Sequence, residues 1–131
     1  MKTRSCKNKG IRLQKWVAEQ ISNVTGIHWG KDTEIRSREA GQQGTDVVLS
    51  DRVKTMFPFS IECKNVEHVN FWDSVEQSKS NQEENLEWLL FIKRNNTEPL
   101  VVLDAELFFK IVKFVIDSSL EEKNETTGTV S

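Results

Sequence analysis

The chain has 131 residues, enough for one domain, and its 37% hydrophobic content can supply one core. This composition excludes a disordered chain, a collagen-like repeat and a disulfide scaffold. Eighteen basic and twenty acidic residues give a formal charge of −2. A nucleic-acid surface would therefore have to come from local clustering of cations.

The cysteines and the apolar runs indicate a cellular compartment. Cys6 and Cys63 form no C-x-x-C pair, which excludes a structural zinc site, and free thiols fit a reducing environment. No apolar run approaches the roughly 18–20 residues of a membrane span, and no signal peptide is recognisable. We therefore expect a cytoplasmic protein with no membrane partner.

Composition shifts divide the chain into three parts. Residues 1–9 carry Lys2, Arg4, Lys7 and Lys9 and are predicted to form a flexible basic arm. Residues 10–118 are predicted to form a single domain. Residues 119–131 are polar and are predicted to be a disordered tail.

Hydrophobic periodicity and turn residues predict the elements of that domain. In chain order they are a helix at 10–25, strands at 33–36 and 46–49, a turn at 50–56, a strand at 57–65, a helix at 70–83, strands at 88–93 and 100–103, and a helix at 105–117. This order predicts an α/β fold, a three-layer-like sandwich in which helices flank a mixed central β-sheet.

Two carboxylates and a lysine form the sequence pattern that most specifically indicates a chemical function. Asp46 begins one predicted strand, and Glu62 and Lys64 stand two residues apart on the next, so that their side chains share a face. A connection of this length can bring Asp46 beside Glu62. Two carboxylates so close raise each other's pKa, and a divalent cation held by both removes that penalty.

Phosphodiester hydrolysis uses this set of groups. The carboxylates would hold Mg²⁺, which polarises a phosphoryl oxygen and lowers the pKa of a bound water. Lys64 would orient or deprotonate that water, or offset charge on phosphorus. Alternation places the Cys63 side chain in the core and leaves its carbonyl oxygen as a further ligand. The alternative is a solvated strand face on which Glu62 and Lys64 form an ordinary surface pair.

The residues around this pattern resemble a known superfamily. Residues 44–46 (GTD) and 59–64 (FSIECK) are similar to the signature of the PD-(D/E)XK nucleases, in particular the small phage-type and Holliday-junction-resolvase-like members. Thr45 stands where the family often has proline. The resemblance extends over residues 9–112 and includes Lys9-Gly10, Arg36, Arg38, the loop from Gly41 to Gly44, Trp72 and Glu76-Gln77.

The resemblance implies a restriction-endonuclease-like core of order αβββαβ and a Mg²⁺-dependent endodeoxyribonuclease in which Mn²⁺ can substitute. Branched or junction DNA is then among the candidate substrates, and a phage-encoded protein would act in the host cytoplasm. Water would attack phosphorus in line and leave a 3′-hydroxyl and a 5′-phosphate. The implied metal ligands are Asp46, Glu62 and the Cys63 carbonyl, with Lys64 as base or stabiliser and Gln77 close to the bound water.

One first-helix residue departs from the family pattern. Relatives often place a glutamate near the metal, whereas the matching position here holds Gln14. Gln14 borders the apolar stripe of this helix, while Glu19 should face solvent. We therefore predict Gln14 as an accessory ligand, and a neutral ligand would weaken metal affinity.

Several cations and aromatic residues are candidate nucleic-acid contacts. Arg36 and Arg38 are predicted phosphate clamps because a guanidinium offers paired donors. Lys9 in the basic arm and Lys79 on the 70–83 helix are further candidates, and solvated side chains are the alternative for all four. The tryptophans could stack on bases, although packing in or beside the core is expected instead for Trp16, Trp72 and Trp88.

The last predicted helix carries apolar side chains over more than half of its circumference. Because a single core needs only a stripe, we predict a homodimer through this helix. The alternative is complete burial within one domain.

A second function is also open: a catalytically silent subunit with the nuclease fold that binds DNA or another protein. Gln14 favours this second function, and the intact set of Asp46, Glu62 and Lys64 opposes it.

Overall fold

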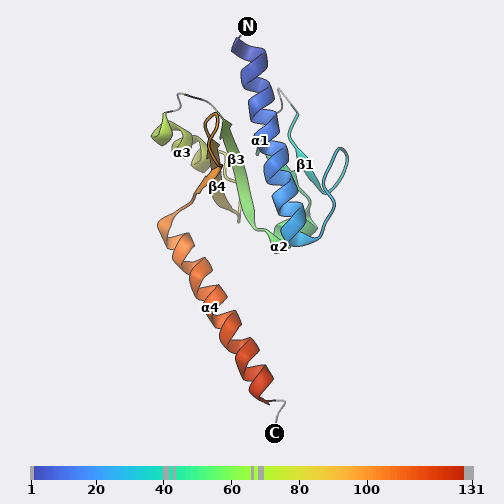
Figure 1. Cartoon of the computed structure of the whole chain (residues 1–131), viewed down its shortest axis with the longest axis vertical. Coiled ribbons are helices and arrows are strands. Elements are labelled where there is room, and N and C mark those ends of the chain that lie inside the picture. The colour runs from blue at the N-terminus through green and yellow to red at the C-terminus, as the bar shows by residue number, and fades with distance from the viewer. Residues whose placement is uncertain (1, 40–41, 43, 66, 68–69, 129–131) are drawn as a thin grey trace.

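The computed structural model describes residues 2–39, 42, 44–65, 67 and 70–128. Figure 1 shows a body that contains α1, α3 and the strands, from which α4 extends as a long arm. In chain order the elements are α1 (Lys2–Thr25), β1 (Ile35–Ser37), β2 (Val47–Leu49), α2 (Asp51–Met56), β3 (Phe59–Asn65), α3 (Phe71–Ser80), β4 (Glu87–Lys93), β5 (Leu100–Val102) and α4 (Ala105–Gly128).

The strands form a mixed sheet and an attached pair. β3 and β4 run parallel and β4 and β5 antiparallel, in the order β3-β4-β5. β1 and β2 form a separate antiparallel pair. The backbone N–H of Asp46, just before β2, donates to the carbonyl of Ile61 on β3 at 2.9 Å and links the pair to the sheet. The predicted mixed α/β architecture is confirmed at this level.

Helices α1 and α3 lie on opposite faces of β3. Ile61 and Cys63 belong to the larger core, which α1 closes with a stripe of apolar side chains. Ser60 and Glu62 point the other way and contact Asn81, the residue that caps the end of α3. The alternation predicted for this strand therefore decides which helix each side chain meets.

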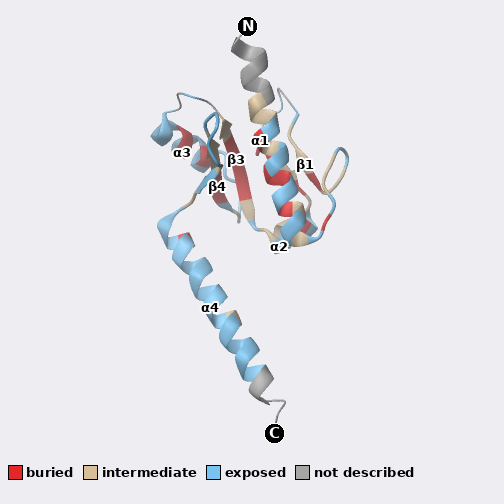
Figure 2. Cartoon of the chain, in the orientation of Figure 1, coloured by how far each residue is buried: buried red, intermediate tan, exposed pale blue. Residues whose placement is uncertain are grey.

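Two hydrophobic clusters hold the body together, and the ribbon in Figure 2 is coloured red where residues are buried. The larger one combines the α1 stripe with residues of β1, β2, α2 and β3, and the smaller one joins Val75 on α3 to Trp88 and Leu90 on β4. Trp88 is buried, as predicted. Trp72 is 72% exposed and Trp16 is 40% exposed, so the prediction that Trp72 packs in or beside the core is wrong.

The predicted bounds of both terminal helices are wrong. α1 begins at Lys2 and not at residue 10, so the segment predicted as a basic arm has a helical backbone from residue 2 onward. α4 continues to Gly128 and not to residue 117, so the segment predicted as a disordered tail is helical through residue 128. Residues 2–9 contain lysine and arginine, and residues 119–128 contain lysine and glutamate, all good helix formers, but both segments lack the apolar periodicity on which the prediction depended.

The turn predicted at residues 50–56 is also wrong, because this segment is the helix α2. The side-chain oxygen of Ser50 accepts the backbone N–H of Val53 at 3.3 Å and caps the first turn. Val53 is fully buried in the larger core. One buried side chain and an N-terminal cap are thus enough to make a short helix here.

Helix α4 is exposed along most of its length (Figure 2). Leu107 is its one buried residue in the part of α4 whose side chains are described, whereas Phe109 is 67% and Phe114 is 73% exposed. The alternative of complete burial within one domain is therefore wrong. In the described part of the chain, no helix is both long and apolar enough to cross a membrane.

Candidate functional site

Asp46 is a buried carboxylate held from two sides. It precedes β2 and is only 4% exposed. Its Oδ2 accepts the backbone N–H of Cys63 at 2.8 Å, and its Oδ1 accepts Nη2 of Arg38 at 2.7 Å. Arg38 also donates to the carbonyl of Gly44 in the loop before the acid. The carboxylate is therefore fixed between this loop and β3.

Glu62 is the second buried carboxylate, 3% exposed, on the face of β3 turned toward α3. Its Oε1 accepts Nδ2 of Asn81 at 2.9 Å. Burial raises the pKa of Glu62 to about 7, and the negative charge of Asp46 adds to this rise. The hydrogen bond from Asn81 and the charge of Lys64 oppose it. Asp46, Glu62 and Lys64 therefore lie near enough to act on one another electrostatically.

Cys63 and Lys64 flank the second acid along β3. The Cys63 side chain is buried in the larger core, and burial raises the pKa of its thiol well above the ordinary value. The thiol therefore stays neutral and is no candidate for a thiolate ligand, which leaves its carbonyl oxygen. Lys64 is half-buried and shares its face of the strand with Glu62.

Gln14 reaches the backbone around the first acid. Its half-buried amide lies 2.7 Å from Oγ of Ser37. In the orientation that satisfies its surroundings, the amide nitrogen donates to the carbonyl of Asp46 at 3.3 Å and to that of Arg38 at 3.2 Å. These bonds fasten α1 to the segment that carries Asp46, and they go to its backbone and not to its carboxylate.

Glu62 is contacted by Asn81, the residue that caps the C-terminus of α3, and the sequence did not predict this contact. Gln77, the predicted residue, is exposed one turn earlier, and its carbonyl accepts the backbone N–H of Asn81 at 3.0 Å. The predicted helix ran to residue 83 and so concealed Asn81 within it. Asparagine is a common residue at helix C-termini, and this signal could have revealed it.

The predicted phosphate contacts occupy separate places. Arg36 lines a cleft of about 350 Å³ between α1 and β1, together with Lys15, Lys31 and Arg38. Lys79 lies 5.9 Å from the centroid of the Trp88 ring, over its face, and 4.0 Å from Glu76. Gly41 of the glycine-containing loop and the side chains of Lys2, Arg4 and Lys7 lie outside the described residues.

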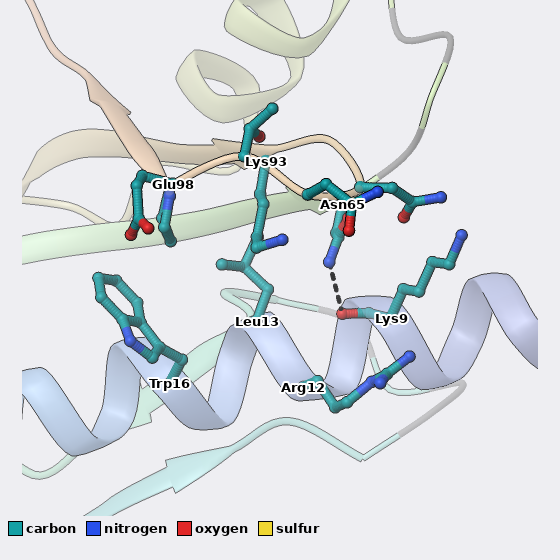
Figure 3. A pocket seen from close by; sticks show the side chains of 11 residues that line it. Lys9, Arg12, Leu13, Trp16, Asn65, Lys93 and Glu98 are labelled. Atoms are coloured by element: carbon teal, nitrogen blue, oxygen red, sulfur yellow. Dashed lines mark hydrogen bonds between the residues drawn. The ribbon is translucent and has the colours of Figure 1, made fainter.

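Lys9 lies at a larger cleft, of about 880 Å³, between α1 and the β4–β5 hairpin. Its carbonyl accepts Nδ2 of Asn65 at 3.2 Å, at the end of β3 (Figure 3). The cleft is lined by Lys9, Arg12, Leu13, Trp16, Asn65, Lys93 and residues 95–99. Because Asn65 and Glu62 point to opposite faces of β3, this cleft and the two buried acids lie on different sides of the strand.

Asp46 and Glu62 suit Mg²⁺ better than they suit a metal ion whose ligands all come from protein side chains. In the described part of the chain, no group of three or more His, Cys, Asp or Glu side chains is arranged to hold a metal. Mg²⁺ needs only one or two carboxylates, because waters and substrate phosphates complete its shell. Each oxygen of Asp46 accepts one hydrogen bond and keeps a second acceptor position. Asp46 and Glu62 are therefore chemically suited to such an ion.

Comparisons of the chain with protein-family models, with curated proteins and with solved structures gave no match.

Proposed function

We propose that this chain is a metal-dependent DNA endonuclease of the PD-(D/E)XK type. The observation that carries the proposal is the adjacency of two buried carboxylates, Asp46 and Glu62, with Lys64 on the same strand face. Burying two like charges side by side is unfavourable unless a cation or a substrate group compensates them. Arg38 compensates Asp46, whereas Glu62 forms no ion pair in the described part of the chain and keeps a raised pKa, so it is the second acid above all that suits a site for a bound cation.

Asp46 and Glu62, with the Cys63 carbonyl, would hold Mg²⁺ or Mn²⁺. The ion supplies a polarised phosphoryl oxygen and a bound water of lowered pKa. Lys64 takes the proton of the attacking water or stabilises the charge that develops on phosphorus. The water oxygen would bond to phosphorus while the bond to the 3′-oxygen breaks, and the leaving 3′-oxygen would take a proton from solvent water, which yields a 5′-phosphate and a 3′-hydroxyl.

The surrounding elements support the same proposal. With the short α2 set aside, the order α1-β1-β2-β3-α3-β4 is the αβββαβ order expected for this superfamily. Arg38 keeps the first acid in place through an ion pair of 2.7 Å, and Asn81 does so for the second through a hydrogen bond. Gln77 and Lys79, on the exposed side of α3, are candidate contacts to the scissile strand.

A second copy of the chain is the proposed partner for α4. Eight large apolar side chains of this helix are at least 36% exposed: Phe108, Phe109, Ile111, Val112, Phe114, Val115, Ile116 and Leu120. Together they offer on the order of 800 Å² per chain, the area that each partner contributes to a standard interface.

The charges on α4 favour an antiparallel pair. Lys110 and Lys113 outweigh Glu106 in the first half of the helix, and the second half has a net negative charge from Asp117, Glu121, Glu122 and Glu125 against Lys123, with Lys113 and Asp117 also paired within the helix at 2.9 Å. In an antiparallel pair the basic half of one copy faces the acidic half of the other, whereas a parallel pair would bring like charges together. The pair would place two nuclease sites in one assembly, as cleavage of two strands or of a branched junction requires.

A cleavage panel tests the proposed activity. Linear duplex, nicked, single-stranded and four-way-junction DNA are incubated with Mg²⁺ and with Mn²⁺, and the Lys64→Ala variant serves as the blank. Cleavage of at least one substrate, metal-dependent and absent from the blank, supports the proposal. Equal cleavage by both proteins would reveal a contaminating nuclease and overturn the assignment.

A catalytically silent DNA-binding or protein-interaction subunit is the second candidate, and two contacts favour it. Arg38 already pairs with Asp46, and the Gln14 amide is directed at backbone carbonyls. Calorimetry with Mn²⁺ separates the candidates, because a catalytic site binds the ion and Glu62→Ala removes that binding. If wild type binds no Mn²⁺ and cuts no DNA, the silent subunit is the better description.

A further inference from the structure

The cleft between α1 and the β4–β5 hairpin combines cations and an aromatic ring along one helix face. Lys9, Arg12 and Trp16 are spaced by three or four residues, so they line the same side of α1. Figure 3 shows Lys9 and Arg12 at one end and Trp16 at the other, with Lys93 between them from the opposite wall. The cleft thus has a basic end and an aromatic end.

The charge of the cleft is opposite to that of the chain. Lys9, Arg12 and Lys93 line it against a single acid, Glu98, although the whole chain has a formal charge of −2. Glu98 lies at the aromatic end, above Trp16, and away from Lys9 and Arg12 (Figure 3). A phosphate group is the anion that lysine and arginine together recognise most commonly.

The dimensions of the cleft fit an unpaired strand and not a duplex. Its volume of about 880 Å³ lies in the range of small-molecule pockets. From Lys9 to Trp16 the helix rises by about 10 Å, at roughly 1.5 Å per residue. This span can hold a few nucleotides with their phosphates at one end and a base at the other, whereas a double helix is too wide to enter.

Polar side chains complete the walls at the basic end. Asn95, Asn96 and Thr97 on the hairpin offer hydrogen bonds. Asn65, whose amide nitrogen is held by the carbonyl of Lys9, has a buried Oδ1 that accepts no hydrogen bond. This oxygen has almost no exposed surface, so it is not within reach of a ligand in the cleft, and the contribution of Asn65 is to join the end of β3 to α1.

We infer that this cleft binds an unpaired segment of a DNA strand. Lys9, Arg12 and Lys93 contact its phosphates, one base stacks on Trp16, and Glu98 accepts N–H groups of that base. The inference goes beyond the proposed nuclease function, because binding here needs neither the metal nor the two acids on the other face of β3.

Fluorescence anisotropy with a labelled ten-residue oligothymidylate in EDTA tests the inference. Trp16→Ala should weaken binding about 10-fold, since stacking on one base is worth about 1–3 kcal/mol, and Trp16→Phe should restore most of the affinity. Trp72→Ala is the matched control, because Trp72 is even more exposed, at 72%, but lies outside the cleft. It should leave the Kd within 2-fold.

Salt dependence supplies a second measurement. Lys9→Ala and Lys93→Ala should each reduce the slope of log K against log salt by about 0.7, the value for one phosphate contact on a single strand. Lys110→Ala, on α4, should leave the slope unchanged. A duplex of equal length should compete at least 10-fold less well than the single strand.

The inference is overturned if Trp16→Ala and Trp72→Ala bind alike, or if the duplex competes as well as the single strand. Because the assay contains EDTA, a failure here leaves the metal-dependent cleavage panel unaffected. The cleavage panel is scored in Mg²⁺ with Lys64→Ala as its blank, whereas the binding assay in EDTA is scored on Trp16→Ala against Trp72→Ala. The two proposals can therefore fail independently.

Discussion

The carboxylate of Asp46 accepts the backbone N–H of Cys63 at 2.8 Å, so the first acid is fastened to the strand that carries the second. Asp46 also donates its own backbone N–H to Ile61 on that strand. A side chain and a backbone group of one residue thus join β2 to β3 at the site. Substitutions of Asp46 therefore affect folding as well as chemistry, while Lys64 offers the cleaner test.

Lys64→Ala is expected to slow DNA cleavage by at least 100-fold, the usual contribution of a positioned proton-transfer group. Lys64 is half-buried on the face of Glu62, and its loss should change the free energy of unfolding by less than about 1 kcal/mol. Single-turnover cleavage and urea unfolding measure the two effects. Asp46→Ala should also stop cleavage, but it should lower the free energy of unfolding by about 3 kcal/mol, because Arg38 and the Cys63 N–H lose their partner.

Asn81→Ala should shift the pH dependence of cleavage. The hydrogen bond from Asn81 lowers the pKa of Glu62, which burial otherwise raises to about 7. Without this bond the pKa rises further, so the rate at pH 7 should fall several-fold and recover as the pH approaches 9. The pH–rate profile at Mn²⁺ concentrations below saturation measures the shift, because proton and metal then compete for Glu62. Asn23→Ala, an exposed asparagine of α1, is the control, and an unshifted profile for Asn81→Ala would contradict this role.

Glu62→Gln should stabilise the metal-free protein at high pH. The folded-state pKa of about 7 lies above the ordinary value of 4.5, so the folded chain retains a proton that the unfolded chain loses between these pH values. Wild-type stability attributable to Glu62 is therefore fully present below pH 4.5 and declines as the pH rises to 7.

The decline should amount to about 2 kcal/mol after allowance for solvent screening. Urea unfolding in EDTA at pH 4.5 and pH 8 measures it, with Glu84→Gln as an exposed control. Glu62→Gln should match wild type at pH 4.5 and exceed it at pH 8. A constant difference between the two proteins at both pH values would argue against a perturbed carboxyl.

Ile116→Glu should convert a dimer into a monomer. Ile116 is 53% exposed on the apolar face of α4, and a buried unpaired carboxylate is strongly unfavourable in an interface. Light scattering coupled to size-exclusion chromatography measures the mass at micromolar concentration. Glu106→Gln, on the polar face, should remain dimeric, and a monomeric wild type would refute the pairing.

Cysteine cross-linking distinguishes the two orientations of the α4 pair. With Cys6 replaced by serine, and for an antiparallel pair that crosses at Phe114, Phe108→Cys alone should form little disulfide dimer, because its two copies lie about 18 Å apart along the helix axes. A mixture of Phe108→Cys and Leu120→Cys should form the mixed disulfide. Efficient linking of Phe108→Cys to itself would show a parallel pair.

The sequence alone predicted the elements that have a regular pattern. Leu13, Val17 and Ile21 recur at helical spacing and do form the buried face of α1, because one apolar stripe is what a helix needs to pack on a sheet. Alternation along β3 likewise separated the core residue Cys63 from the pair Glu62 and Lys64. The same local rules suggested Asp46 as their neighbour, since its connection to the strand is short.

Only the tertiary structure decided which groups meet across long separations. Nothing local to Asn81 indicates Glu62 as its partner, and nothing in the basic segment indicates that Lys9 shares a cleft with Lys93. The ends of α1 and α4 were missed for a related reason: polar helical turns carry no apolar period, and their length follows from backbone propensity alone. Periodicity records which side of an element is buried, whereas the contacts of a site depend on how separate elements are brought together, and that is set by the packing of the whole chain.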